Sequence, residues 1–208
     1  MNIVIIGTGY VGLVTGVGLA SLGNTVDFID LDENKIEDLS DKKITFYEPG
    51  LEEYFNDDQT FKRMSFSSDY RSIKWDNIDI VFVCVQTPNN IETNSVDTNF
   101  LESAIKEINN VNNSELVITV KSTIPPYEIE KVCEKVGMDS SKLTFNPEFL
   151  REGSAVEDFF KPDRIVLGGT DSEKLSNLKE LYSGFECEII ITDSISSQLI
   201  KYLSLIHI

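Results

Sequence analysis

The chain has 208 residues, of which 41% are apolar, which is enough for one well-buried domain and the start of a second. Its formal net charge is −17, which argues against nucleic acid and anionic membranes as partners. No apolar run reaches the roughly 18 residues that a membrane span needs, and no charged-then-apolar leader precedes the first predicted strand. We therefore expect a cytoplasmic protein.

The first 22 residues carry the most informative pattern of the chain. Residues 3–6 form an apolar run, Gly7, Gly9 and Gly12 follow, and an apolar segment of helical length covers residues 13–22. The order strand, glycine turn, helix is the context in which G-x-G-x-x-G indicates a dinucleotide site. We expect Gly7 to permit the tight turn, Gly9 to let the backbone approach a pyrophosphate, and Gly12 to let the helix pack closely on the strand. The pyrophosphate would lie at the helix N-terminus.

An acidic residue follows the second predicted strand, residues 25–29. Asp30 stands close to the spacing of about 20 residues after the last glycine at which a carboxylate binds the ribose hydroxyls of NAD. A carboxylate there repels the extra phosphate of NADP, so the pattern favours NAD. The alternative, a surface acid after an ordinary strand, is the weaker interpretation because the glycine turn lies one strand upstream.

Apolar runs alternate with amphipathic segments along most of the chain. This pattern predicts an α/β protein with a doubly wound, mostly parallel Rossmann-type sheet covered by helices on both faces. The predicted strands are residues 3–6, 25–29, 64–66, 80–85, 116–120, 143–145, 164–167 and 188–191. The predicted helices are residues 13–22, 101–108, 127–136 and 173–181.

Polar residues follow three of the predicted strands, at positions 86–88, 121–123 and 146–148. Because the carboxyl ends of parallel strands meet at one edge of a sheet, we expect four of these side chains to lie near a nicotinamide. They are Thr87, Ser122, Thr123 and Glu148. Each of them alone also fits a turn or a helix cap. The three cysteines, Cys84, Cys133 and Cys187, show neither metal-ligand spacing nor a disulfide framework.

Six motifs lie in order along the chain. They are G-T-G-Y-V-G-L at 7–13, F-Y-E-P-G-L at 46–51, T-P at 87–88, K-S-T-I-P at 121–125, N-P-E-F-L-R-E-G at 146–153 and P-D-R-I-V-L-G at 162–168. Together they resemble the UDP-glucose 6-dehydrogenases and their nucleotide-sugar dehydrogenase relatives, up to about Tyr202. In that family a primary alcohol of the sugar is oxidised to an acid while two NAD are reduced. The resemblance implies NAD as cofactor, a UDP-sugar as substrate and a homodimer for the full-length protein.

The resemblance also implies a role for individual residues. The implied cofactor-binding residues are Gly7, Gly9, Tyr10, Val11 and Gly12 at the pyrophosphate, Asp30 and Lys35 at the ribose, Thr87 and Thr123 at the nicotinamide, and Glu152. The implied substrate-binding residues are Glu148, Phe149, Leu150, Arg151, Glu152 and Lys201. The implied catalytic residues are Thr123, which helps to position a water, Glu148, which transfers protons, and Lys201, which stabilises oxyanion character on the sugar.

The C-terminal end departs from the family pattern. The family carries a catalytic thiol in a G-F-G-G-x-C-F-x-K-D motif beyond Lys201, and none of the three cysteines matches it. Leu205 stands where the family has an asparagine, residues 203–208 fit nothing in the family, and His207 is more simply incidental. We expect an NAD-binding domain over residues 1–194 and the start of a central helical dimerisation domain over residues 195–208. We also expect this chain to be inactive alone.

Other interpretations of the function stay open. The chain is either part of an enzyme that oxidises UDP-glucose to UDP-glucuronate, or a truncated module that binds NAD without turnover. A relative acting on another nucleotide sugar, such as GDP-mannose, is a third interpretation, although the segments 46–51 and 161–165 favour UDP-glucose. A 2-hydroxy-acid or 3-hydroxyacyl dehydrogenase is disfavoured, because such enzymes use a catalytic histidine and His207 is the one histidine of the chain.

Overall fold

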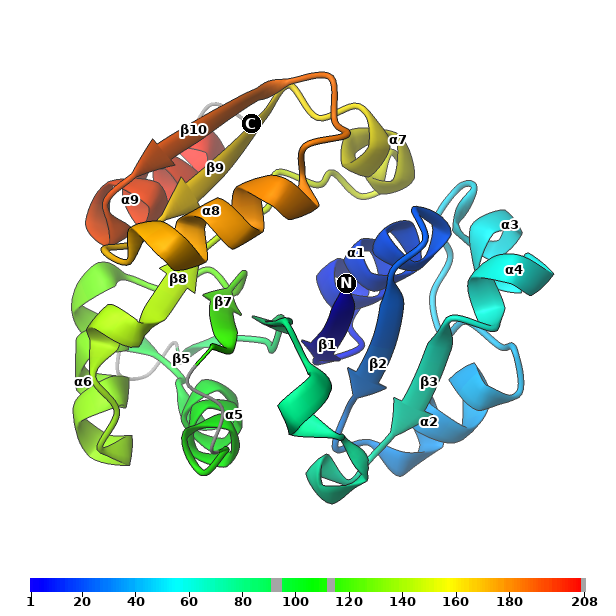
Figure 1. Cartoon of the computed structure of the whole chain (residues 1–208), viewed down its shortest axis with the longest axis horizontal. Helices are drawn as coiled ribbons and strands as arrows, with labels where there is room; N and C mark the ends of the chain where they lie inside the picture. Colours follow the sequence, from blue (N-terminus) through cyan, green and yellow to red (C-terminus); the bar gives the residue numbers. More distant parts are fainter. Residues whose placement is uncertain (91–94, 112–114, 207–208) are drawn as a thin grey trace.

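The computed structural model describes residues 1–90, 95–111 and 115–206 and shows one large sheet with helices on both faces (Figure 1). Across this sheet the strands are β10 (Glu188–Thr192), β9 (Arg164–Gly168), β8 (Leu143–Phe145), β7 (Val117–Val120), β4 (Ile80–Val83), β1 (Asn2–Ile6), β2 (Thr25–Ile29) and β3 (Met64–Ser67). A two-stranded antiparallel ribbon pairs β5 (Asn89–Asn90) with β6 (Ser95–Val96).

The helices of the described residues lie between these strands and after the last one. They are α1 (Tyr10–Ser21), α2 (Glu33–Ser40), α3 (Leu51–Asn56), α4 (Asp58–Phe61), α5 (Asn99–Asn109), α6 (Pro126–Val136), α7 (Ala155–Phe160), α8 (Ser172–Leu181) and α9 (Ser194–Ile206). Short 3-10 turns cover Tyr70–Ser72, Trp75–Asn77 and Ser140–Lys142. No helix in the described part of the chain is long and apolar enough to cross a membrane.

The sheet is mostly parallel, as the sequence predicted. From β3 to β8 each strand runs parallel to its neighbour, and β9 runs parallel to β10. The one antiparallel pair in the large sheet joins β8 to β9, where Phe145 lies opposite Gly168. The chain winds outward from β1 to β3 and then outward in the other direction from β4 to β8. This reversal between β1 and β4 is the topological switch point at which ligands bind in doubly wound sheets.

Buried side chains form one cluster on each face of the sheet. Because successive strand residues point to opposite faces, Ile3 and Ile5 belong to one cluster and Val4 and Ile6 to the other. The first cluster is covered by α1, α3, α7 and α8, and the second by α5 and α6. Both faces of the central strands are therefore dry, which explains why β1 and β4 are apolar without alternation.

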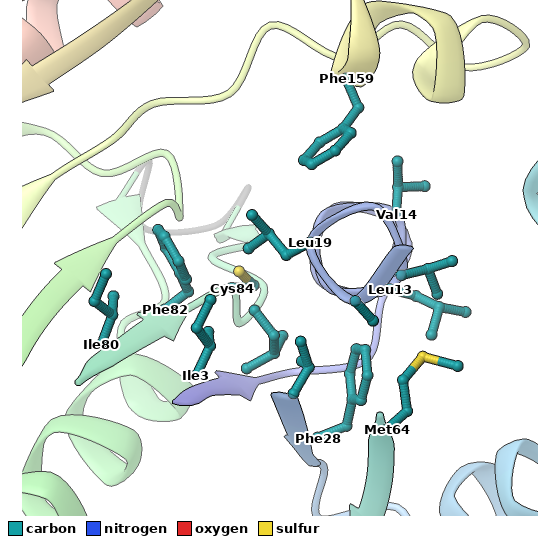
Figure 2. Close-up of a cluster of buried hydrophobic side chains, with 14 of the residues drawn as sticks. Ile3, Leu13, Val14, Leu19, Phe28, Met64, Ile80, Phe82, Cys84 and Phe159 are labelled. Atoms are coloured by element: carbon teal, nitrogen blue, oxygen red, sulfur yellow. The ribbon is translucent and has the colours of Figure 1, made fainter. Parts of the chain in front are cut away.

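Helix α1 lies at the centre of the first cluster, between the sheet and α7 (Figure 2). Two of its glycines let the neighbours approach closely. A Cβ on Gly16 would lie 2.3 Å from the ring of Phe28 in the sheet, and a Cβ on Gly18 would lie 2.2 Å from the ring of Phe159 in α7. The small residues of this helix thus have a packing role besides the role of the glycine turn before it.

The predicted elements are present, with shifted ends. The strand predicted over residues 80–85 ends at Val83, because Cys84 and Val85 already turn beneath the glycine turn, where a Cβ on Gly7 would lie 2.8 Å from Cys84 O. The strand predicted over residues 116–120 begins at Val117. The short helices α2, α3, α4 and α7 were not predicted. Helix α9 covers residues 195–206 of the predicted second domain, and residues 207 and 208 of that prediction lie outside the described residues. The helix packs closely on β9, since a Cβ on Gly168 would lie 2.0 Å from Ser197 Oγ. The boundary at residue 194 stays a prediction.

Candidate active site at the carboxyl edge of the sheet

Two clefts, each of about 690 Å³, open at the carboxyl ends of the central strands. We call one the glycine-turn cleft; among its lining residues are Gly7, Gly9, Tyr10, Asp30, Thr87 and Thr123. We call the other the loop cleft; among its lining residues are Phe149, Leu150, Arg151, Lys161 and Arg164. Lys121 and Glu148 line both clefts, so the two spaces meet at these side chains.

The glycine turn has the geometry that a pyrophosphate needs. Gly7 has a φ of +97°, a conformation that side chains disfavour, and a Cβ on Gly12 would lie 1.9 Å from Gly7 O. A Cβ on Gly9, in contrast, would meet nothing within 4 Å, so the backbone here borders open space. No side chain caps the N-terminus of α1 at Gly9. The residues present therefore fit a dinucleotide, with the open space over Gly9 and the N–H groups of the first helical turn available to the phosphates.

Asp30 lies at the end of β2, beside the glycine turn. Its Oδ2 accepts hydrogen bonds from the Thr8 N–H (2.8 Å) and hydroxyl (2.7 Å), and its Oδ1 accepts one from the Asp32 N–H (3.1 Å). Burial alone would raise the pKa of this carboxyl, but these hydrogen bonds and Lys35, 3.9 Å away, hold the pKa below its usual value. Since a carboxylate has about four lone-pair sites, the three bonds leave room for one further donor, such as a ribose hydroxyl.

The ends of β4 and β7 are held together on the opposite side of this cleft. The Thr87 hydroxyl donates to Thr123 O (2.7 Å), and the Ser122 hydroxyl donates to Val85 O. All four residues line the glycine-turn cleft. The structure thus brings Thr87, which follows β4, together with Ser122 and Thr123, which follow β7.

Glu148, at the meeting point of the clefts, forms an ion pair with Lys201, which lines neither cleft. Lys201 Nζ lies 2.6 Å from Glu148 Oε1, and the Leu150 N–H donates to Glu148 Oε2 (2.7 Å). The two side chains are only 9% and 13% exposed, for Lys201 and Glu148 respectively. In this dry environment the interaction is strong, and each charge depends on the other for compensation.

A second buried lysine lies close to this pair and was not among the predicted site residues. Lys121 Nζ donates to Asn146 Oδ1 (2.8 Å), which also accepts from the Tyr182 hydroxyl (2.7 Å). Burial lowers the pKa of Lys121 and raises that of Tyr182. The position of Lys121 directly after a strand was the one sign in the sequence that it could belong to the site. Nothing local in the sequence connects Lys121 to Tyr182, which follows α8.

The loop between β8 and α7, residues 146–154, forms one wall of the loop cleft. The Arg151 guanidinium binds Asp158 through Nε and Nη2, at 3.1 and 2.6 Å, so its charge is already paired. The Arg164 guanidinium lies over the ring of Phe149, with 5.0 Å to the centroid. Arg164 and Lys161 are therefore further cations of this cleft, which the sequence interpretation named only within the segment 161–165 and not as site residues.

The remaining predicted residues are placed as follows. Val11 and Lys35 line the glycine-turn cleft, whereas Gly12 is buried beneath it. Glu152 is exposed and lines neither cleft. Cys84 lines the glycine-turn cleft, but burial raises the pKa of its thiol to about 12, which disfavours the thiolate at neutral pH. Within the described ranges no group of three or more His, Cys, Asp or Glu side chains could hold a metal ion.

Comparisons with known proteins identify the family of this chain. The NAD-binding domain of the UDP-glucose/GDP-mannose dehydrogenase family matches residues 1–186. A UDP-glucose 6-dehydrogenase from Rickettsia bellii is 39% identical over 207 residues, covering 97% of this chain and 47% of the relative.

Solved structures of two dehydrogenases superpose on nearly the whole chain. A GDP-mannose dehydrogenase from Pseudomonas aeruginosa has a TM-score of 0.90 at 28% identity, covering 100% of this chain and 50% of that one. A UDP-glucose dehydrogenase from Pyrobaculum islandicum has a TM-score of 0.87 at 33% identity, covering 99% and 49%. The chain spans about half the length of the curated relatives it matches. It belongs to the UDP-glucose/GDP-mannose dehydrogenase family, of which it carries the NAD-binding domain.

Proposed function

We propose that this chain provides the cofactor domain and part of the sugar site of an NAD-dependent dehydrogenase that oxidises UDP-glucose to UDP-glucuronate in two hydride transfers. The observation that carries the proposal is that Glu148, which lines both the glycine-turn cleft and the loop cleft, is paired directly behind this junction with the buried Lys201. A reacting sugar alcohol has to lie at such a junction, because it must contact both the cofactor and the groups that handle its proton.

The glycine-turn cleft holds NAD in this proposal. The pyrophosphate lies against the turn of Gly7, Gly9 and Gly12 and the backbone of Tyr10 and Val11, the ribose against Asp30 and Lys35, and the nicotinamide toward Thr87 and Thr123. Bound NAD supplies the hydride acceptor. Glu152 remains a predicted contact from family resemblance, and its exposed position outside both clefts does not support that role.

Glu148 and Lys201 handle charge on the sugar side. The Lys201 ammonium stabilises negative charge on the alcohol oxygen as its proton leaves, in a setting with little competing water. Glu148 takes part in the proton transfer, directly or through a water that Thr123 helps to position. Phe149, Leu150 and Arg151 line the loop cleft and contact the UDP-sugar.

The trapping of an aldehyde by a thiolate is assigned to none of the three cysteines. Burial raises the pKa of Cys84 to about 12 and that of Cys133 to about 11, and Cys187 also has a raised pKa. This observation favours a second candidate function, a module that binds NAD without completing the double oxidation. The likeness to a GDP-mannose dehydrogenase favours a third, in which another nucleotide sugar occupies the loop cleft.

A dimer is part of the proposal for the full-length protein. Helix α9 exposes Ile195, Leu199 and Leu203, which recur every four residues and so lie on one face of the helix.

The test is to titrate the chain with NAD and then to follow NADH absorbance after adding UDP-glucose or GDP-mannose. NADH formation with UDP-glucose that Lys201→Met abolishes supports the enzyme, whereas faster formation with GDP-mannose points to the third function. NAD binding without NADH formation is expected both of the module and of a chain that carries only part of the sugar site, and NADH formation by the full-length protein then separates the two. No NAD binding by the wild-type chain, or equal binding by Gly12→Ala, contradicts the proposal.

A further inference from the structure

Glu48 is a buried carboxylate that ties together two parts of the site distant in the sequence. It precedes α3, is 4% exposed, and lines neither cleft. Its Oε2 accepts hydrogen bonds from the Tyr10 hydroxyl and the Gly153 N–H, both at 2.8 Å, and its Oε1 accepts one from the Ala155 N–H, also at 2.8 Å. One donor belongs to the first residue of α1, and the other two belong to the end of the 146–154 loop and the start of α7.

Tyr10 extends this connection to both clefts. Its hydroxyl lies 3.0 Å from Arg151 O as well as 2.8 Å from Glu48 Oε2. Tyr10 lines the glycine-turn cleft and Arg151 lines the loop cleft. Burial, together with the hydrogen bond to Glu48, raises the pKa of Tyr10, so the hydroxyl keeps its proton and remains a donor. Its ring packs against Phe46, with 5.4 Å between centroids, which keeps the 46–50 segment next to the turn.

The energetic cost of breaking this arrangement makes it a coupling element. A buried carboxylate that loses a hydrogen-bond donor is destabilised, because part of its desolvation cost is then no longer offset. The glycine turn and the 146–154 loop, which Glu48 connects, therefore do not move independently. If the glycine turn shifts, Tyr10 moves relative to Glu48. Either the 146–154 loop then moves with them, or one of the hydrogen bonds to Glu48 is broken. Asp158 of α7 holds the loop separately and does not contact the turn. It accepts hydrogen bonds from the Arg151 N–H and from the Ser154 hydroxyl.

We infer that Glu48 is a positioning residue that couples NAD binding at the glycine turn to the conformation of the 146–154 loop, and thereby to binding of the nucleotide sugar. The inference rests on the proposed function, since it assigns NAD to one cleft and the sugar to the other. It gives Glu48 no contact with either ligand.

Glu48→Gln tests the coupling with little change of shape. A glutamine offers one acceptor oxygen and an NH₂ group in place of two acceptor oxygens. Its NH₂ group must therefore face other donors: either the Ala155 N–H, or both the Tyr10 hydroxyl and the Gly153 N–H. Tyr10→Phe removes the hydroxyl and leaves both loop bonds of Glu48 in place. Glu52→Gln is the matched control, because Glu52 is an exposed glutamate on the adjacent α3 and the substitution removes the same charge.

Two readouts separate coupling from binding. Hydrogen exchange of a peptide covering residues 146–156 is measured with and without NAD, and NAD affinity is measured with and without UDP-glucose. In the wild-type chain and Glu52→Gln we expect NAD to slow the exchange and UDP-glucose to tighten NAD binding by about fivefold or more, in the usual range of coupled sites. In Glu48→Gln we expect both effects to shrink to less than about twofold, while NAD still binds. In Tyr10→Phe we expect the same loss of both effects.

The outcomes are distinguishable from a failure of the proposed function. Unchanged coupling in Glu48→Gln overturns the inference. It is also overturned if NAD binds to the wild-type chain without slowing hydrogen exchange in the loop and if UDP-glucose leaves the NAD affinity unchanged. Either result leaves the assignment of NAD to the glycine-turn cleft intact. Absence of NAD binding by the wild-type chain overturns both. If Glu48→Gln does not fold, Tyr10→Phe decides the matter alone, because it leaves the buried carboxylate with its two backbone donors.

Discussion

Glu148 and Lys201 are 53 positions apart, and each compensates a charge that would otherwise be buried alone. The Lys201 ammonium has further N–H donors beyond the one bound to Glu148, so it can turn to a substrate oxygen without leaving the carboxylate.

Removing one partner of this pair should destabilise the fold more than removing both. Lys201→Met leaves the Glu148 carboxylate without compensation, and we expect a loss of about 3 kcal/mol in the free energy of unfolding. The double variant Lys201→Met/Glu148→Leu should lose less than either single variant. Urea denaturation of all four chains measures this coupling. Additive losses would show that the two charges do not depend on each other in the folded chain.

Asp30 should make stability depend on pH in acid. Its pKa is lowered in the folded chain, so the folded state holds the ionised form more strongly than the unfolded state does. Its contribution is therefore complete above the unfolded pKa of about 3.9 and is lost as the pH falls through the lower folded pKa. We expect the stability difference between the wild-type chain and Asp30→Asn to be largest near neutrality and to shrink below about pH 4. Urea unfolding at a series of pH values checks this, and a difference that grows in acid would contradict it.

At the scale of elements, α1 performs two tasks with its glycines. Gly12 brings the helix against the glycine turn, and Gly16 and Gly18 bring its flanks against Phe28 and Phe159 (Figure 2). Helix propensity alone argues against this many glycines, each of which costs about 1 kcal/mol relative to alanine. The close approach of α7 and the sheet explains why alanine does not fit there.

Gly18→Ala should therefore destabilise the chain although alanine is the better helix former. The new methyl group would lie 2.2 Å from the Phe159 ring, and we expect a loss of about 1–3 kcal/mol from overpacking. Gly184→Ala is the control, because its Cβ would meet nothing within 4 Å and Gly184 has no positive φ. Thermal unfolding of both variants decides the point: equal melting temperatures would show that α7 moves away freely.

Elements with a strong apolar pattern were predictable and short ones were not. β2 and β8 have the predicted bounds, β1 begins one residue earlier than predicted, and α5, α6 and α8 lie where amphipathic segments predicted helices. Helices α3, α4 and α7 have four to six residues, which is too short for a helical period to stand out. They form because tertiary contacts bury Phe55 and Phe159 in the first cluster, with α3 and α7 then packed around α1.

At the scale of the whole molecule, acidic side chains outnumber basic ones by a wide margin, and the formal net charge is −17. The cations of the site are placed individually: Lys35 beside Asp30, Lys121 at the meeting point of the clefts, Lys201 beside Glu148, and Arg164 over Phe149. An anionic ligand is thus bound against the overall field of the molecule by local groups.

Screening of this charge should stabilise the fold. Raising the NaCl concentration from about 0.01 M to about 0.1 M shortens the Debye length from about 30 Å to about 10 Å and weakens repulsion among surface carboxylates. We expect the melting temperature to rise by about 2–4 °C, as a gain of about 1 kcal/mol gives for a domain of this size. A variant with the exposed Glu186 and Glu188 changed to lysine should respond less. A melting temperature that falls with salt would show that attractive ion pairs dominate instead.

The sequence by itself determined the features that depend on neighbours along the chain. The turn of Gly7, Gly9 and Gly12, the acid at position 30 and the alternation of strands and helices are local patterns, because backbone geometry and hydrophobic periodicity act over a few residues. From these the fold class and the NAD-binding family followed, as did the placing of Thr87 and Thr123 at one edge of the sheet.

Only the tertiary structure decided which distant side chains meet. Glu48 reaches Gly153 and Ala155 across 105 and 107 positions, and Lys121 meets Tyr182 through Asn146. No local pattern contains these contacts, because they depend on the register and order of strands and on burial, which turns ordinary polar residues into obligatory partners. The same physics makes the buried Glu48 a connection between the clefts, while the exposed Glu152, from the motif at 146–153, lines neither cleft.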